Sequence, residues 1–177
     1  MILSDLQILR AIEIGDIQIS PFNRDSLGSN SYDLHLSPHY ALYKDEKLDA
    51  KKDNPLRRFL IPEEGLTLYP NTLYLMSTVE HTESYNCVPC VETKSSVARL
   101  GISAHLTAGF GDNGFTGHWT LEVTCVKPVT IYAGMPFVQI YWEETGVCLN
   151  PYNKKSDAKY SQQSELPQGS KMFKNFI

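Results

Sequence analysis

Short runs in which apolar and polar residues alternate constrain the fold of this chain more than any other feature of its sequence. The run YDLHLS at residues 32–37 has an apolar side chain at every second position, and similar runs recur at 67–78, 119–126 and 129–142. Alternation with a period of two puts the apolar side chains on one face of a strand. Proline, glycine and asparagine punctuate these runs, as tight turns between strands require. The sequence therefore predicts a mainly β protein.

The N-terminal segment has a helical pattern instead. Ser4 and Gln7 stand at the spacing of a capping box, and Gly15 stands where a helix would end. The apolar residues between them at helical spacing are Leu6, Leu9 and Ile12. One short N-terminal helix is expected.

The length and composition favour one domain over residues 1–177. The charged stretch 44–58 has no periodicity and is expected to be a solvated loop. From about residue 152 the chain is polar and has few residues that could anchor it to a core, so a mobile tail is expected.

The charge balance limits the classes of partner. Sixteen basic and twenty acidic residues give a net charge of -4, which does not favour binding of polymeric nucleic acid. No stretch is apolar for long enough to span a membrane, and charged residues interrupt the N-terminus where a signal peptide would be apolar. We therefore expect a cytoplasmic protein with no membrane partner, whose four cysteines are reduced thiols.

The segment HTESYNCVPC contains the residue types of a zinc-dependent nucleobase deaminase. His81 and Glu83 form a His-x-Glu pair, and Cys87 and Cys90 form a Cys-x-x-Cys pair. A zinc deaminase carries these two pairs on separate elements, whereas here they are nearly adjacent and Asn86 replaces the usual proline. We therefore expect no zinc, and we interpret the two cysteines as small apolar residues.

Residues 91–123 carry an unusual density of polar functional side chains. If 95–100 form one helical turn, Ser95 and Arg99 share a face, and Lys94 with the free N–H groups of the turn suits a phosphate. A capped short helix with an exposed charge explains the same spacing. The run 119–126 puts Glu122 on the polar face of a strand, where an ordinary surface glutamate is the alternative.

Several motifs together resemble the dCTP deaminase family, which is related to the trimeric dUTPases. "KSSVARLG" resembles the signature of the family, and "TLE" puts Glu122 at the position of its catalytic glutamate. "SNSYDLHL", "AGMPFVQI" and "YNKKSDAKYSQQ" resemble the first motif, the fourth motif and the C-terminal lid. Thr93 departs from the family, which often has glycine there.

The resemblance implies a fold and an assembly. The expected fold is a distorted jelly-roll or β-barrel of the trimeric dUTPase type, with a short N-terminal helix and a flexible C-terminal lid at about 152–177. The expected assembly is a homotrimer with sites between neighbouring subunits. Mg²⁺ is expected on the triphosphate of the substrate dCTP, with no metal at the base. Inhibition by dTTP, frequent in the family, stays open.

The resemblance also implies residue roles. Glu122 would be the general base that takes a proton from the attacking water, Ser95 would hold that water, and Arg99 would orient Glu122 and stabilise developing charge. The implied substrate-binding residues are Lys94, Ser96, Ala108, Asp112, Gln139, Tyr152, Lys159 and Gln163.

The main expectation for the reaction is deamination of dCTP to dUTP and ammonia. Some family members also cleave the α–β phosphate bond and release dUMP and pyrophosphate, and Ala108-Gly109 ahead of the Asp112 turn resembles that bifunctional type. A plain dUTPase is a rival, although Arg99 and Glu122 argue against it. A nucleotide-binding regulatory protein without turnover is the third alternative.

Overall fold

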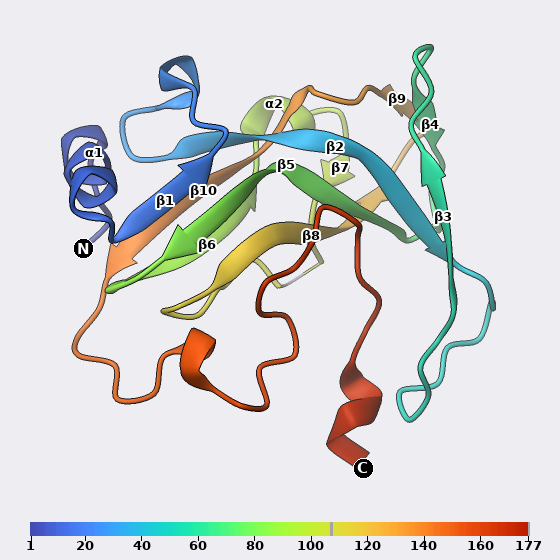
Figure 1. The fold of residues 1–177 in the computed structure, drawn as a ribbon. Coiled ribbons are helices and arrows are strands. Elements are labelled where there is room, and N and C mark those ends of the chain that lie inside the picture. Colours follow the sequence, from blue (N-terminus) through green and yellow to red (C-terminus); the bar gives the residue numbers. More distant parts are fainter. Residues whose placement is uncertain (107, 177) are drawn as a thin grey trace.

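The strands of this protein form one curved, barrel-like sheet and a small second sheet (Figure 1), in a computed structural model that describes residues 1–106 and 108–176. The strands are β1 (Ile17–Ser20), β2 (Tyr32–Tyr43), β3 (Leu56–Leu60), β4 (Leu66–Leu68), β5 (Tyr74–Ser84), β6 (Cys87–Thr93), β7 (Ile102–Ser103), β8 (Thr116–Cys125), β9 (Val129–Ile131) and β10 (Pro136–Glu144). The helices are α1 (Asp5–Ile14) and α2 (Ser95–Ala98), and the 3-10 turns are η1 (Arg24–Ser26), η2 (Tyr152–Lys154) and η3 (Met172–Phe176). The expectation of a mainly β, barrel-like fold with a short N-terminal helix is confirmed.

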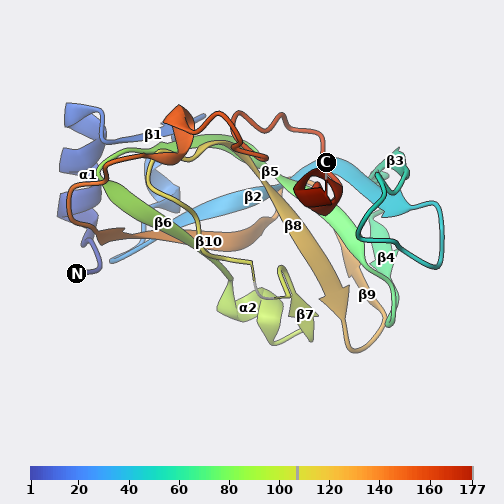
Figure 2. The ribbon, with the colours of Figure 1, turned by 90° about the horizontal axis from the view of Figure 1, so that it is seen from below.

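The main sheet has the strand order β6-β10-β2-β5-β8-β7, with β1 also paired to β5 and β3 also paired to β2. All the pairs are antiparallel, and β4 pairs with β9 in the second sheet. Figure 2 shows α1 beside one end of the sheet and β3 and β4 at the other. Within the described ranges, no helix is long and apolar enough to cross a membrane.

Helix α1 begins and ends where the sequence predicts. The Ser4 side chain accepts a hydrogen bond from the backbone N–H of Gln7, and the Gln7 side chain accepts one from the backbone N–H of Ser4. Gly15 caps the other end in the left-handed conformation, with φ of 83°. Ile8 is the fully buried residue through which the helix packs on the sheet.

The alternation predicted for 119–126 is present in β8. Trp119, Leu121 and Val123 are buried in the core, whereas Thr120 and Glu122 between them are only partly buried. The same strand therefore contributes to the core on one face and carries polar groups on the other.

The segment HTESYNCVPC covers the end of β5, the turn after it and the start of β6, and these two strands do not pair with each other. Cys87 and Cys90 are buried in β6, and burial raises the pKa of the Cys87 thiol to about 12. A thiol of that kind is a poor source of the thiolate that zinc requires. Among the residues that the structure describes, no group of three or more His, Cys, Asp or Glu side chains could hold a metal ion.

The expectation of a solvated loop over 44–58 is wrong at its end, because β3 begins at Leu56 and pairs with β2. All five residues of β3 are partly or fully exposed, so the strand has no buried face and no alternation to reveal it. Its charged residues Arg57 and Arg58 suit the edge of a sheet, where they discourage pairing with another chain.

The C-terminal tail has more anchors than its composition predicts. Gln163 and Pro167 are buried, and residues 160–170 pack across β8, β5 and β2 (Figure 1). The expectation of few anchoring residues is therefore wrong for this part of the tail. Its hydrogen-bonded anchors, such as Gln163, are polar, and a search for apolar residues overlooks them.

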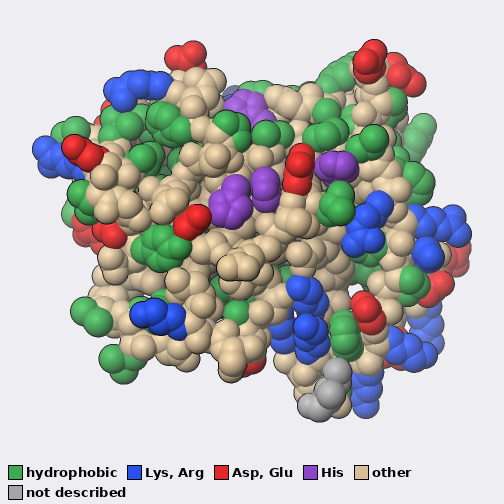
Figure 3. Space-filling view, viewed as in Figure 1, with side chains coloured by type: hydrophobic (Ala, Val, Ile, Leu, Met, Phe, Trp, Pro, Cys, Tyr) green, Lys and Arg blue, Asp and Glu red, His purple; other side chains and the backbone are tan. Residues whose placement is uncertain are grey.

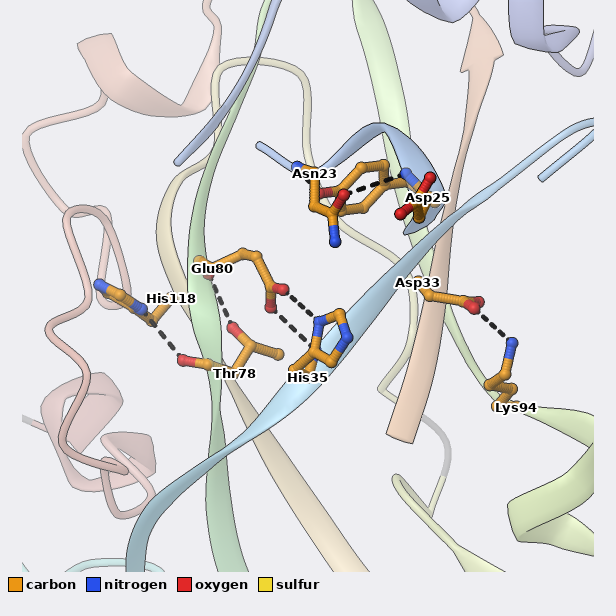
Figure 4. Close-up of polar contacts among 9 residues, drawn as sticks. Asn23, Asp25, Asp33, His35, Thr78, Glu80, Lys94 and His118 are labelled. Carbon is orange, nitrogen blue, oxygen red and sulfur yellow. Dashed lines mark hydrogen bonds and ion pairs between the residues drawn. The ribbon is translucent and has the colours of Figure 1, made fainter. Parts of the chain in front are cut away.

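The buried Glu80 carboxylate of β5 bonds to His35 of β2 near the point where the pairing of β5 changes register. Glu80, 3% exposed, accepts hydrogen bonds from the backbone N–H of His35 at 2.8 Å and pairs with the His35 ring Nδ1 at 2.5 Å (Figure 4). The pairing of β5 with both β2 and β8 is irregular here, so backbone groups lose their ladder partners. Thr78 contributes to the same network, because its hydroxyl donates to the Glu80 carbonyl and accepts from the Trp119 N–H.

Replacing His35 with alanine should lower the free energy of unfolding by about 3 kcal/mol, because a buried carboxylate loses its partner. Urea unfolding at neutral pH measures this. His39→Ala, on the same strand and more loosely held, is the matched control and should cost about 0.5 kcal/mol or less. Equal losses in the two variants would contradict the importance given to the His35–Glu80 pair.

Candidate active site

A cavity of about 470 Å³ opens between β8, the loop after β7 and the C-terminal tail. It brings together residues that are far apart in the sequence. Five site residues expected from the sequence are among those that line it: Ala108, Asp112, Glu122, Tyr152 and Gln163. Thr120 also lines the cavity and is new.

Glu122 is held in the cavity by the alternation of β8. Its neighbours Leu121 and Val123 point into the core, so Glu122 points to the opposite face. Burial raises the pKa of the Glu122 carboxyl above its ordinary value. A carboxylate with a raised pKa is a stronger base, which suits proton transfer near neutral pH.

Three aromatic side chains cover one side of the cavity. They are Phe115, Trp119 and Tyr152, here named the aromatic wall. The rings of Phe115 and Trp119 lie 4.3 Å apart between centroids, and the ring of Tyr152 lies 6.4 Å from that of Phe115. Burial also raises the pKa of the Tyr152 hydroxyl. Such a wall is typical of sites that hold a planar or apolar part of a ligand.

Backbone hydrogen bonds hold the loop that carries Asp112 in place. The Phe115 N–H donates to the Asp112 carbonyl at 3.0 Å, and the Gly114 N–H donates to the Ser84 carbonyl at 2.7 Å. The Tyr152 N–H donates to the Asn113 carbonyl at 2.8 Å, which joins the tail to this loop. Asp112 itself is exposed at the cavity.

Gly109 stands where no side chain fits. A Cβ there would lie 2.3 Å from the Val91 carbonyl oxygen, and the Val91 N–H already donates to the Gly109 carbonyl at 2.7 Å. A bulkier residue would therefore displace the loop that brings Ala108 to the cavity.

The remaining expected site residues lie outside this cavity. Ser95, Ser96 and Arg99 are exposed on or beside α2, which lies on the opposite side of the sheet from the C-terminal tail (Figure 2). The Lys94 ammonium pairs with Asp33 of β2 (Figure 4).

Two more expected residues are also outside. Gln139 lies on β10, where its strand partners are Asp33 and Glu92. Lys159 donates a hydrogen bond to the Asn175 side chain. One chain therefore brings Glu122 together with Asp112 and with the tail residues Tyr152 and Gln163, but not with Arg99.

Positive charge gathers beside the cavity. Figure 3 shows Lys and Arg side chains clustered over the C-terminal segment and the β3 region. A second cavity of about 460 Å³ is lined by Arg58, Lys171 and Lys174, and it shares Gln168 and Gly169 with the first. Burial and the nearby Lys174 charge lower the pKa of Lys171. Clustered cations next to a cleft attract anionic groups such as phosphates.

Sequence reasoning missed Thr120 and the aromatic wall. Thr120 lies two residues before Glu122 on the same face of β8, so the alternation that identified Glu122 also pointed to Thr120. Phe115 and Trp119 gave no comparable signal, because buried aromatic residues are common in any core.

Relatives of high similarity span nearly the whole chain. "dCTP deaminase, dUMP-forming" of Clostridium acetobutylicum is 45% identical over 177 residues, covering 100% of this chain and 99% of the relative. The protein of the same name from Hathewaya histolytica is 44% identical over 176 residues, covering 99% of each chain. That from Leptospira biflexa is 42% identical over 176 residues, covering 99% of this chain and 98% of the relative.

A solved structure shares the fold. The crystal structure of 2'-deoxycytidine 5'-triphosphate deaminase from Agrobacterium tumefaciens superposes with a TM-score of 0.64 at 18% identity. The match covers 84% of this chain and 50% of that one. At this identity the likeness supports the fold alone.

The family model described as "dCTP deaminase-like" matches residues 2–145, which include β8 and the loop that carries Asp112. Together with relatives above 40% identity over nearly the full length, this match agrees with the resemblance found in the motifs. The chain belongs to the dCTP deaminase-like family.

Proposed function

We propose that this protein is a dUMP-forming dCTP deaminase. It replaces the 4-amino group of the cytosine of dCTP with oxygen and cleaves the bond between the α and β phosphates, releasing ammonia, dUMP and pyrophosphate. The observation that carries the proposal is that relatives 42–45% identical over nearly the full length have this name. The cavity supports it, since Glu122 and Asp112 line the same space.

The main expectation from the sequence, that the reaction stops at dUTP, is wrong, because these relatives are named dUMP-forming. The alternative, with dUMP and pyrophosphate as products, replaces it. Neither a plain dUTPase nor a regulatory protein without turnover agrees with those names.

For the deamination, Glu122 would take a proton from water as the water attacks C4, and then pass protons toward the departing ammonia. Its burial supports this role, because the raised pKa makes the carboxylate a better proton acceptor. The aromatic wall beside it would exclude bulk water from the base and strengthen the electrostatic interactions there.

Ser95 and Arg99 would come to this cavity from a second copy of the chain. Both are exposed on the side of the sheet away from the tail, so they are free to reach a neighbour. Ser95 would hold the attacking water, and the Arg99 guanidinium would orient Glu122. Lys94 and Ser96, on the same segment, would approach the phosphates. A homotrimer, in which each site uses two subunits, is the assembly we propose.

The tail and the loop would hold the sugar and triphosphate. Asp112 would contact the 3′-hydroxyl, Ala108 would lie along the nucleotide, and Tyr152, Lys159 and Gln163 would approach the phosphates. Gln139 would come near the sugar and phosphates from β10. The tail would act as a lid over the bound nucleotide.

Magnesium would enter with the nucleotide. The cavity offers two carboxylates, those of Asp112 and Glu122, whereas Mg²⁺ takes six oxygen ligands. Phosphate oxygens and water would therefore supply most of the ligands, and the ion would neutralise phosphate charge. Two other expectations remain predictions: one domain over 1–177 and a cytoplasmic location.

Glu122→Gln should lower the rate of ammonia release from dCTP by about 10²- to 10⁴-fold, because the amide keeps the shape but cannot accept the proton. The dissociation constant for dCTP should change by no more than about threefold, since the exchange removes only the base. Ammonia release and calorimetric titration measure the two quantities. Glu143→Gln, an exposed glutamate at the end of β10, is the control and should match the wild type. Near wild-type ammonia release by Glu122→Gln would refute the role of this residue.

Purified protein given dCTP should release ammonia and pyrophosphate in equal amounts, with dUMP as the nucleotide product. Chromatography of the nucleotides and a coupled assay for pyrophosphate test this. Accumulation of dUTP with no pyrophosphate would restore deamination as the sole reaction and contradict the proposal.

Mixing two inactive variants should restore activity if the site is shared. In trimers assembled from equal amounts of Glu122→Gln and Arg99→Ala subunits, about one quarter of the sites would carry both native residues. Ammonia release should therefore recover to about a quarter of the wild-type rate. A mixture of Glu122→Gln with the double variant contains no native site and is the control. Failure to recover would show that Glu122 and Arg99 do not act across a subunit boundary.

A further inference from the structure

The C-terminal segment 162–170, here named the tail strap, is seated on its own chain by specific hydrogen bonds. The Gln162 N–H donates to the Thr116 carbonyl at 2.7 Å, and the His118 N–H donates to the Gln163 carbonyl at 3.0 Å. The strap thus makes a short parallel bridge to β8 at Gly117. A Cβ on Gly117 would lie 2.5 Å from the Gln163 nitrogen, and the φ of Gly117, +139°, also favours glycine. Glycine at this position therefore allows the backbone of the strap to approach the backbone of β8 closely.

Hydroxyl groups from two neighbouring strands hold the middle of the strap. The Ser37 hydroxyl of β2 donates to a Glu165 carboxylate oxygen at 3.0 Å, and the Ser77 hydroxyl of β5 donates to the Glu165 carbonyl. Both serines are fully buried, so each hydroxyl needs a partner, and the strap supplies it.

A third hydroxyl, that of Thr120 on β8, makes two contacts with the strap. It donates to the Gln163 side-chain oxygen at 2.9 Å and accepts from the Gln168 N–H at 3.2 Å. Thr120 of β8 is also the direct strand partner of Ser77 of β5, so the hydroxyls that contact the strap lie on adjacent strands.

The donation to Gln163 orients its amide. With the oxygen engaged by Thr120, the two N–H groups of the amide remain to donate elsewhere. Gln163 lines the cavity together with Thr120 and Glu122, so a nucleotide oxygen in that cavity is an acceptor of the right kind.

We infer that Thr120 is a positioning residue that couples the seating of the tail strap to the strand carrying Glu122. The residue contacts the strap at two points and stands two residues from Glu122 on the same face of β8. Strap and nucleotide therefore stabilise each other: a seated strap presents the Gln163 amide to the nucleotide, and a bound nucleotide holds the strap in place. The kinetic part of this inference rests on the proposed function, whereas the structural part does not.

The test compares three single variants of the full-length protein. Thr120→Val keeps the β-branched shape and removes the hydroxyl, and Thr120→Ser keeps the hydroxyl. Thr124→Val is the matched control, because Thr124 lies on the same face of β8 and its side chain makes no hydrogen bond to the tail strap among the residues described. Hydrogen exchange of the backbone amides in 162–170 reports seating without any turnover, and steady-state ammonia release from dCTP reports KM and kcat.

In Thr120→Val, exchange of the strap amides, Gln168 above all, should rise about fivefold or more, the loss expected for one hydrogen bond. KM for dCTP should rise by a similar factor while kcat changes less than twofold. Thr120→Ser should restore both quantities, and Thr124→Val should leave both at wild-type values.

Wild-type exchange and KM in Thr120→Val would overturn the inference. An equal rise of strap exchange in Thr120→Val and Thr124→Val would overturn it too, because it would reveal a general loosening of β8. If the wild type released no ammonia from dCTP, the proposed function would fail, and the exchange data alone would decide whether Thr120 seats the strap.

Discussion

Burial of one carboxylate, Glu122, is the condition on which the candidate site depends. Strand β8 sets the direction of this side chain. Leu121 and Val123 point into the core, so Glu122 between them points to the opposite face of the strand. The aromatic wall and the C-terminal tail line the same cavity as Glu122, and the loss of water raises the pKa of its carboxyl. The fold thus turns an ordinary side chain into a better base.

Polar side chains help to assemble the surroundings of this carboxylate. The Glu80 carboxylate and the Thr78 hydroxyl supply hydrogen bonds where β5 departs from regular pairing, and they lie next to the part of β8 that leads to the cavity. The hydroxyls of Thr120 and Ser77 then seat the tail across the same strands. Buried polar groups of this kind impose one arrangement, because any other leaves them without partners.

Local patterns made parts of this structure predictable, and contacts between distant segments made the rest unpredictable. The capping box of α1 and the alternation of β8 are local, and both appear as expected. Strand β3 has no buried face to generate a pattern, and the anchors of the tail, such as Gln163, find partners that lie more than 40 residues away along the chain. The site was recognised from motifs. Only the fold shows that the expected site residues fall into two groups. One group lines the cavity, and the other, which includes Arg99, lies on or beside the exposed α2.

The most direct measurement of the central claim is a titration of Glu122 itself. Carbon-13 NMR of the labelled side-chain carboxyl, with Glu122→Gln to assign the signal, gives its pKa in the free protein. The pH dependence of kcat/KM for ammonia release gives the pKa of the group that must be deprotonated. The account predicts that the two values agree and lie above the ordinary value of a glutamate. An ordinary pKa for Glu122, or an acidic limb of the activity profile at a different pH, would contradict it.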